Sequence, residues 1–208
     1  MLIYLVRHWQ TQANVDEVCS WHIETPLTEL GITQAQATWQ TLKWITFDAI
    51  LSSDLSRAYD TAKYIIGEQN IITTTLLRER YYYSYEWTNW IVKKHAEEMW
   101  LIPSRYWEVW WNRPKHPIEN NEEMIVRWNQ IIEEHIKDKE YQNVLITSHG
   151  SFLRCVMVNV LQLQLGEKWV SEFLSPMSNC AINIIEYRPD QWLRLVTYNQ
   201  HLHLLNLA

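Results

Sequence analysis

Two cationic side chains, Arg7 and His8, follow directly on an apolar run near the start of the chain. Residues 2–6 are apolar throughout and suit a short buried strand. In a parallel α/β sheet, ligands bind in the crevice beyond the carboxyl ends of the strands. A guanidinium beside an imidazole at such a point offers a lasting positive charge and a nucleophile or base. This pair predicts an enzyme that moves a phosphoryl group.

Further short blocks with the same kind of side chains follow in order along the chain. They are Thr25-Pro26-Leu27-Thr28-Glu29-Leu30-Gly31, Ser52-Ser53-Asp54-Leu55-Ser56-Arg57-Ala58, Leu77-Arg78-Glu79 and Thr147-Ser148-His149-Gly150. The ordered set resembles the histidine phosphatase superfamily, also called the phosphoglycerate-mutase-like family. That family's pattern runs Arg-His-Gly, Pro-Leu-Thr-x-x-Gly, Ser-Ser-x-x-x-Arg-Ala, Leu-x-Glu and Ser-His-Gly. The matches extend from position 4 to about 199, so the resemblance covers essentially the whole sequence.

The resemblance implies a role for each of five catalytic residues. It makes His8 the nucleophile that becomes a phosphohistidine, and Glu79 the proton donor to the leaving group. It makes Arg7 and Arg57 clamps on the phosphoryl oxygens, with His149 beside the nucleophile. Planar guanidinium groups suit this task because they bind phosphoryl oxygens in a bidentate manner and stay charged.

The residues alone leave plainer interpretations open. His8 could be a hydrogen-bonded histidine at a strand end, Arg57 a solvated helix residue, and His149 a cap at a helix N-terminus. Glu79 could instead pair with its basic neighbours, with Glu86 or Asp54 as the acid.

Four more residues follow the first strand and match positions at the substrate mouth of the resembling family. They are Asn14, Thr11, Ser20 and Trp21. We expect these side chains to bind substrate.

Length, charge and composition limit the classes of protein to which the chain could belong. The chain has 208 residues and a net charge of -6, which fits a single domain (1–208) and argues against nucleic acid, since phosphate-backbone binding needs a basic face. The longest apolar stretches fall short of a membrane span. Three scattered cysteines favour a reducing cytoplasm. We expect no metal and no other cofactor, because neither a ligand cluster nor a glycine-rich nucleotide loop is present.

Glycine and tryptophan counts are unusual. There are only 4 glycines and 13 tryptophans, against roughly 7% glycine in average proteins. The resemblance suggests a glycine at several positions that hold a bulky ring: Trp9, Trp21, Trp39, Trp44, Trp87 and Tyr83. If position 9 needs a positive φ, Trp9 adds strain and its indole could close the phosphate pocket. A catalytically impaired or engineered member of the family that only binds ligand therefore remains an alternative.

The expected elements alternate between strands and helices, which favours βαβ units. Strands are expected at 2–6, 48–52, 71–75, 143–147, 180–187 and 192–198. Helices are expected at 28–44, at 54–67 with Asp54 as its cap, at 122–137 and through Leu153 to Val160. The fold class is therefore an α/β, three-layer α/β/α sandwich with a mainly parallel central sheet, with an aromatic lid insertion at about 81–117.

The expected activity is a metal-independent phosphomonoesterase that hydrolyses small phosphorylated metabolites through a phosphohistidine. Its compact length and the stretch after Leu77-Arg78-Glu79 resemble the phosphatase branch of the family. Phosphoglycerate-mutase-type phosphoryl transfer is the alternative, because both reactions pass through phosphohistidine. The ribazole phosphate of cobalamin synthesis is one candidate substrate. A homodimer is left open.

Overall fold

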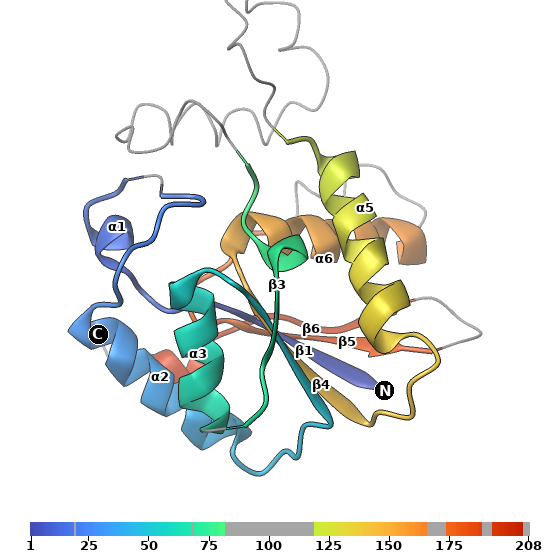
Figure 1. Ribbon diagram of the computed structural model, residues 1–208, viewed down its shortest axis with the longest axis horizontal. Helices are drawn as coiled ribbons and strands as arrows, with labels where there is room; N and C mark the ends of the chain where they lie inside the picture. Colours follow the sequence, from blue (N-terminus) through green and yellow to red (C-terminus); the bar gives the residue numbers. More distant parts are fainter. Residues whose placement is uncertain (19, 68, 82–118, 166–173, 189–192, 206–208) are drawn as a thin grey trace, which may run out of the picture.

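A six-stranded sheet forms the centre of the molecule (Figure 1). The structure is a computed structural model that describes residues 1–18, 20–67, 69–81, 119–165, 174–188 and 193–205. Along the sheet the strand order is β3-β2-β4-β1-β5-β6. The strands are β1 (Leu2–Arg7), β2 (Ala49–Ser53), β3 (Ile72–Thr74), β4 (Asn143–Ser148), β5 (Ile182–Tyr187) and β6 (Leu193–Gln200).

The sheet is mixed. Strands β1, β2, β3 and β4 pair in parallel, as the alternation of strands and helices predicts. Strands β5 and β6 join antiparallel, with β5 against β1. The first strand of the chain therefore lies between two strands from its last third, and its carboxyl end is fixed from both sides.

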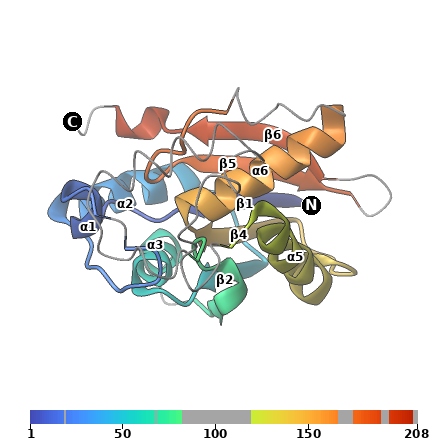
Figure 2. The ribbon, with the colours of Figure 1, turned by 90° about the horizontal axis from the view of Figure 1, so that it is seen from above.

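Helices cover both faces of the sheet, which confirms the three-layer architecture (Figure 2). Alternate residues of β1 show the division, because Ile3 and Leu5 pack with α5 and α6 while Tyr4 and Val6 pack with α2 and α3. The helices are α1 (Gln12–Val15), α2 (Glu29–Leu42), α3 (Ser56–Ile66), α5 (Asn121–Ile131) and α6 (Gly150–Leu165). Shorter turns are η1 (Thr75–Leu77), the π-helical η4 (Ile132–Ile136) and η6 (Leu202–Leu204).

Local sequence explains how several helices begin and end. The Thr28 side chain caps α2 by accepting from the N–H of Gly31. The expected cap of α3 is wrong: Leu55 occupies the cap position, while Asp54 forms an ion pair with Arg78. The first turn of α3 is capped from a distance instead, because the Glu24 carboxylate accepts from the N–H of Ser56.

The Trp9 indole packs in the core and does not close the expected phosphate pocket. It is fully buried in the apolar cluster on the α2 and α3 face of the sheet and contacts the tilted ring of Tyr64, with ring centroids 5.3 Å apart. Its φ is not positive, so the expected backbone strain is absent at this residue. Trp21 is different, because its φ of +22° lies in the region that favours glycine.

The expected aromatic lid at about 81–117 lies outside the residues that the structure describes, except for Tyr81. This segment includes Trp87, Glu86 and Tyr83.

In the described parts of the chain, no helix combines the length and apolar character that crossing a membrane would require. Cys155 and Cys180 are buried free thiols, and Cys19 is not among the described residues.

Candidate active site

Three parallel strands end side by side at one edge of the sheet and bring the two motif histidines together. In the β1–β4 pairing Arg7 stands opposite Ser148, and in the β2–β4 pairing Ser52 stands opposite Thr147. His8 and His149 are the next residues after β1 and β4. Their ring centroids lie 5.2 Å apart, as expected of side chains that share one phosphoryl group.

The hydrogen bond of His8 determines which of its nitrogens can attack. Nδ1 lies 2.8 Å from the carbonyl oxygen of Trp9, and a carbonyl can only accept, so Nδ1 carries the proton. Burial, followed by the charges of Arg57 and Arg7, holds the pKa of His8 well below its ordinary value. Nε2 therefore keeps its lone pair at neutral pH.

The two arginines approach the histidines from different elements. Arg7 is half-buried at the end of β1; its Nη1 donates to the carbonyl of Met177, and its buried Nε has no hydrogen-bond partner among the described residues. Arg57 is 2% exposed in the first turn of α3, and it donates to the carbonyls of Trp21 and Ile23. The guanidinium charges are therefore held rigidly beside the two rings.

His149 is oriented by a serine from the neighbouring strand. Its Nε2 lies 2.9 Å from Oγ of Ser53, the last residue of β2. Its Nδ1 is buried without a hydrogen-bond partner in the part of the chain that the structure describes. Burial and the charge of Arg57 hold the pKa of His149 well below its ordinary value. A neutral ring with one N–H can still donate to a phosphoryl oxygen.

Glu79 is buried at the amino end of α6 rather than on the surface. Its Oε1 accepts from the N–H groups of Arg80 (2.8 Å) and Phe152 (3.0 Å), and its Oε2 accepts from Ser151 (3.0 Å). The neighbouring Arg78 pairs with Asp54. These contacts attach the Leu-x-Glu block to the Ser-His-Gly block.

The four residues expected to bind substrate lie in two segments, one at α1 and one in the loop that follows it. Asn14 is half-buried in α1, while Thr11 is the fully buried N-cap of that helix and its hydroxyl donates to Oδ1 of Asn14. Thr11 thus has no exposed surface and contacts Asn14 instead. In the next loop, the carbonyl of Trp21 accepts from Arg57 and that of Ser20 accepts from the N–H of Ile23; the Trp21 residue itself is 8% exposed.

Two residues that contact the site were not predicted from the sequence. His22 donates from Nε2 to the carbonyl of Glu79 (2.7 Å) and stacks on Tyr81. Asn179 donates to the carbonyl of His8 and to Asn14 from far along the chain. His22 lies next to two expected mouth residues, which is a signal that could have found it. No local pattern marks Asn179.

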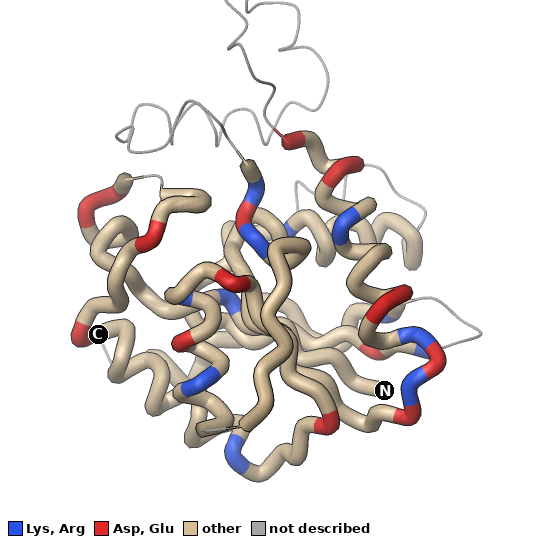
Figure 3. The backbone as a smooth tube through the Cα atoms, viewed as in Figure 1, with Lys and Arg blue, Asp and Glu red and all other residues tan. Residues whose placement is uncertain are grey.

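Both signs of charge occur around this acidic protein. Figure 3 shows Lys and Arg as well as Asp and Glu positions near the carboxyl ends of the strands and also at the opposite end of the sheet. No group of three or more His, Cys, Asp or Glu side chains suited to a metal ion occurs among the described residues. The positive charge that the described site offers comes from its arginines.

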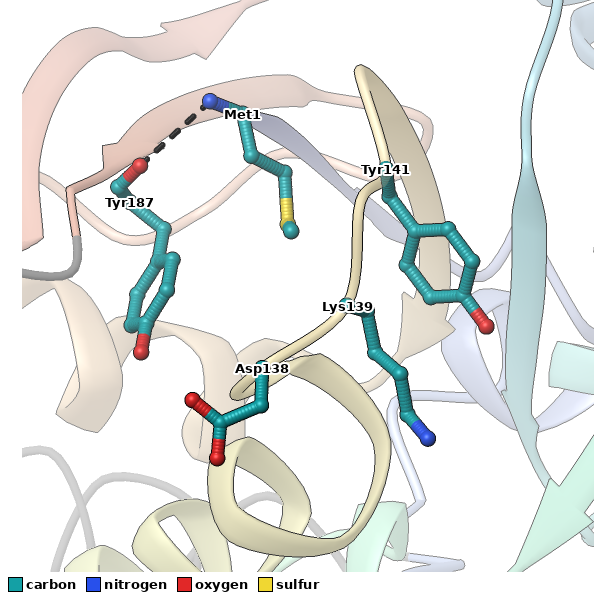
Figure 4. Close-up of a pocket in the computed structure, with 5 residues that line it drawn as sticks. All are labelled: Met1, Asp138, Lys139, Tyr141 and Tyr187. Atoms are coloured by element: carbon teal, nitrogen blue, oxygen red, sulfur yellow. Dashed lines mark hydrogen bonds between the residues drawn. The ribbon is translucent and has the colours of Figure 1, made fainter.

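A separate cavity of about 190 Å³ lies at the opposite edge of the sheet (Figure 4). It is lined by Met1, Asp138, Lys139, Tyr141 and Tyr187. The amino group of Met1 donates to the carbonyl of Tyr187 (3.4 Å), and the side chains of Asp138 and Lys139 are exposed. This cavity contains none of the motif residues.

Comparison with known proteins decides the family. A model described as "Histidine phosphatase superfamily (branch 1)" matches residues 3–201. The chain belongs to this superfamily. Its blocks of motif residues are therefore those of a histidine phosphatase, and the resemblance seen in the sequence is confirmed.

Individual relatives carry names of two kinds. The chain is 30% identical over 175 residues to the adenosylcobalamin/alpha-ribazole phosphatase of Escherichia coli K12, covering 81% of this chain and 83% of that protein. It is 29% identical to a probable phosphoglycerate mutase GpmB of Proteus mirabilis, covering 92% and 87%. The crystal structure of the alpha-ribazole phosphatase of Shigella flexneri aligns with a TM-score of 0.73, 26% identity and 96% coverage of both chains. The phosphatases among these relatives support the conclusion that this member of the superfamily is an enzyme.

Proposed function

We propose that the protein is a phosphomonoesterase that hydrolyses small phosphorylated metabolites through a phosphohistidine on His8. The observation that carries the proposal is the state of the His8 ring. Its Nδ1–H is held by the carbonyl of Trp9, so its Nε2 is the unprotonated nitrogen, beside the half-buried Arg7 and the buried Arg57. A neutral imidazole nitrogen next to fixed positive charge is a nucleophile matched to a phosphate ester.

In the first step, the lone pair of His8 Nε2 attacks phosphorus and the bond from phosphorus to the leaving oxygen breaks. Arg7, Arg57 and the N–H of His149 stabilise the negative charge on the phosphoryl oxygens as the group transfers. Glu79 donates a proton to the leaving oxygen, so the product leaves as an alcohol. In the second step, water attacks phosphorus, its proton returns to Glu79, and the bond from phosphorus to His8 breaks.

The contacts of Glu79 indicate which of its oxygens carries that proton. Each carboxylate oxygen has two acceptor positions, and Oε1 uses both, for the N–H groups of Arg80 and Phe152. Oε2 uses one, for Ser151, and keeps the other. Oε2 is therefore the oxygen with an acceptor position left for the proton that passes to and from the leaving oxygen.

Hydrolysis is favoured over phosphoryl return by the compact chain and by the phosphatase names of several relatives. The Escherichia coli relative suggests alpha-ribazole phosphate, and a putative phosphoserine phosphatase 2 of Hydrogenobacter thermophilus, 30% identical over 177 residues, suggests phosphoserine. Both substrates are small phosphate monoesters. The burial of Trp9 away from the pocket favours a working enzyme over a binding protein.

The test is turnover of a panel of phosphomonoesters, including alpha-ribazole phosphate and phosphoserine, with and without a chelator. Mutase activity on phosphoglycerate is measured in parallel. We expect phosphate release that the chelator leaves unchanged. Alkaline denaturation during turnover should trap an acid-labile phosphate, because phosphoramidates hydrolyse in acid and survive base. Phosphoryl transfer without net phosphate release would instead assign a mutase, and a protein that is never labelled would contradict the mechanism.

A further inference from the structure

Asn179 lies between β5 and the motif residues, and its side-chain amide reaches the end of β1. Its Nδ2 lies 2.9 Å from the carbonyl oxygen of His8 and 3.3 Å from Oδ1 of Asn14. A carbonyl oxygen can only accept, so the atom of Asn179 that faces His8 must be the amide nitrogen. The backbone at the nucleophile thus fixes the orientation of Asn179.

The same reasoning fixes the amide of Asn14. The backbone N–H of Thr11 can only donate, and it lies 3.1 Å from Oδ1 of Asn14. The hydroxyl of Thr11 adds a second donor at 3.1 Å, and Asn179 is the third. These three donors share the two lone pairs of one oxygen, so the Nδ2 of Asn14 points the other way. Among the described residues that nitrogen has no hydrogen-bond partner.

We propose that Asn179 is a positioning residue that holds the Asn14 amide with its N–H groups toward the phosphoryl oxygens. The inference rests on the proposed function of this site. Asn179 contacts both the nucleophile's carbonyl and Asn14, so it also sets the distance between them. Its neighbour Met177 accepts from the guanidinium of Arg7. The segment before β5 therefore orients three residues of the site from behind.

The sharpest test is Asn179→Asp, which changes one amide nitrogen to an oxygen with almost no change in shape. The carboxylate would face two oxygens, the carbonyl of His8 and Oδ1 of Asn14. Asn14 would turn its Nδ2 toward the carboxylate, because a hydrogen bond to a charged acceptor is stronger than one to a neutral acceptor. Its donors would then be lost to the phosphoryl group.

The readout is binding of inorganic phosphate, as a competitive inhibitor and by the NMR signals of the Asn14 side-chain amide. In the unchanged protein, phosphate should shift those amide signals. In Asn179→Asp, we expect phosphate binding to weaken about 10- to 100-fold, the value of a hydrogen bond to a charged group, and the shift to disappear. Asn179→Ala, which adds no charge, should weaken binding about threefold. It serves as the second variant if the aspartate variant does not fold.

Asn199→Asp is the matched control. Asn199 holds the same segment, since its Oδ1 accepts from the N–H of Ser178 (2.8 Å), and an aspartate keeps that acceptor. The substitution adds the same charge without touching His8 or Asn14. We expect phosphate binding within about twofold of the unchanged protein. An equal loss in both variants would overturn the proposal, because general damage to the segment would then explain the effect.

A double-mutant cycle separates positioning from independent support. If Asn179 acts through Asn14, Asn179→Ala should cost much less in the Asn14→Ala background than in the unchanged protein. Equal losses in both backgrounds would contradict the proposal. Phosphate binding needs no turnover, so a protein that binds phosphate but hydrolyses no ester would refute the proposed function and still test Asn179.

Discussion

The two edges of the central sheet hold similar side chains in different physical states. At the amino edge, Asp138 and Lys139 border a cavity and stay exposed, so water and salt screen their charges. At the carboxyl edge, Arg57 and His149 are nearly or fully buried, and their hydrogen bonds go to the backbone or to another buried side chain. Removal from water strengthens electrostatic interactions and shifts pKa values. The difference teaches that burial, and not the presence of ionisable side chains alone, distinguishes the motif residues from those at the other edge.

The strongest test of this contrast removes the nucleophile and compares it with a change at the other edge. His8→Ala should lower kcat by about 10,000-fold or more and abolish the acid-labile phosphate label, because the proposed covalent intermediate forms on His8. Lys139→Ala, at the amino edge, should leave kcat within about twofold. Steady-state turnover and label trapping measure both. Full turnover in the His8 variant would end the phosphohistidine mechanism.

Arg57→Lys asks whether the carboxyl edge needs a guanidinium or only a positive charge. A lysine keeps the charge but cannot bind phosphate in a bidentate manner while also holding the carbonyls of Trp21 and Ile23. We expect kcat/KM to fall by about 100-fold with most of the loss in kcat. A variant with unchanged kcat would show that Arg57 serves only to fix the loop.

Substituting Trp9 tests whether a change in the apolar core alters stability rather than activity. The indole is fully buried, so Trp9→Gly should lower the free energy of unfolding by about 3–5 kcal/mol through the cavity it leaves. Thermal or urea unfolding measures the loss, with the exposed Trp44→Gly as control. If Trp9→Gly raised activity without lowering stability, the indole would have to lie in the pocket, which would contradict its burial in the core.

Two glycines offer a matched pair of substitutions. A Cβ at Gly150 would lie 3.1 Å from Nε of Arg7, so Gly150→Ala should displace the guanidinium and lower kcat/KM by about tenfold with little loss of stability. Gly67 has a φ of +73° and open space around it, so Gly67→Ala should cost about 1 kcal/mol of stability and leave kcat/KM unchanged. Kinetics and urea unfolding on both variants should show opposite patterns. If both lose only stability, Arg7 does not act on substrate.

The smallest expected effect concerns pH. The pKa values of His8 and His149 are both held well below the ordinary value, chiefly by burial. The acid limb of kcat/KM should therefore fall well below pH 6.5, the ordinary histidine value. In the unfolded chain these rings bind protons below about pH 6.5, so the folded state binds fewer and loses stability as pH falls through that range. An acid limb at pH 6.5 or above would show that His8 is more solvated than its surroundings here indicate.

Much of the site could be predicted because its chemistry is local in sequence. Arg7 and His8 stand at the end of an apolar run, and His149 follows another, so the strand ends and their meeting follow from parallel pairing. The path of the Trp9 indole could not be predicted, because the choice between pocket and core depends on packing with α3 and with residues distant in sequence.

Other contacts were missed for the same physical reason. The cap of α3 comes from Glu24, 32 residues earlier, and Asp54 is drawn instead to Arg78. Asn179 meets His8 across 171 residues, and neither side chain carries a periodic signal of that meeting. The short connection between the expected strands 180–187 and 192–198 permits only antiparallel pairing of β5 with β6, whereas the antiparallel pairing of β5 with β1 has no local signal.

The position of β1 in the sheet has a consequence for synthesis of the protein. His8 directly follows β1, yet β1 pairs with β4 and β5 from the last third of the sequence. At its carboxyl end the N–H of Arg7 donates to Ala181, and the carbonyl of His8 accepts from Asn179. A ribosome-bound chain that has exposed only its first half therefore has Arg7 and His8 but no pocket. Pairing between such distant segments makes folding slow, and the first strand must wait without its partners. Catalytic competence should thus arrive late and abruptly, as the last third of the chain emerges.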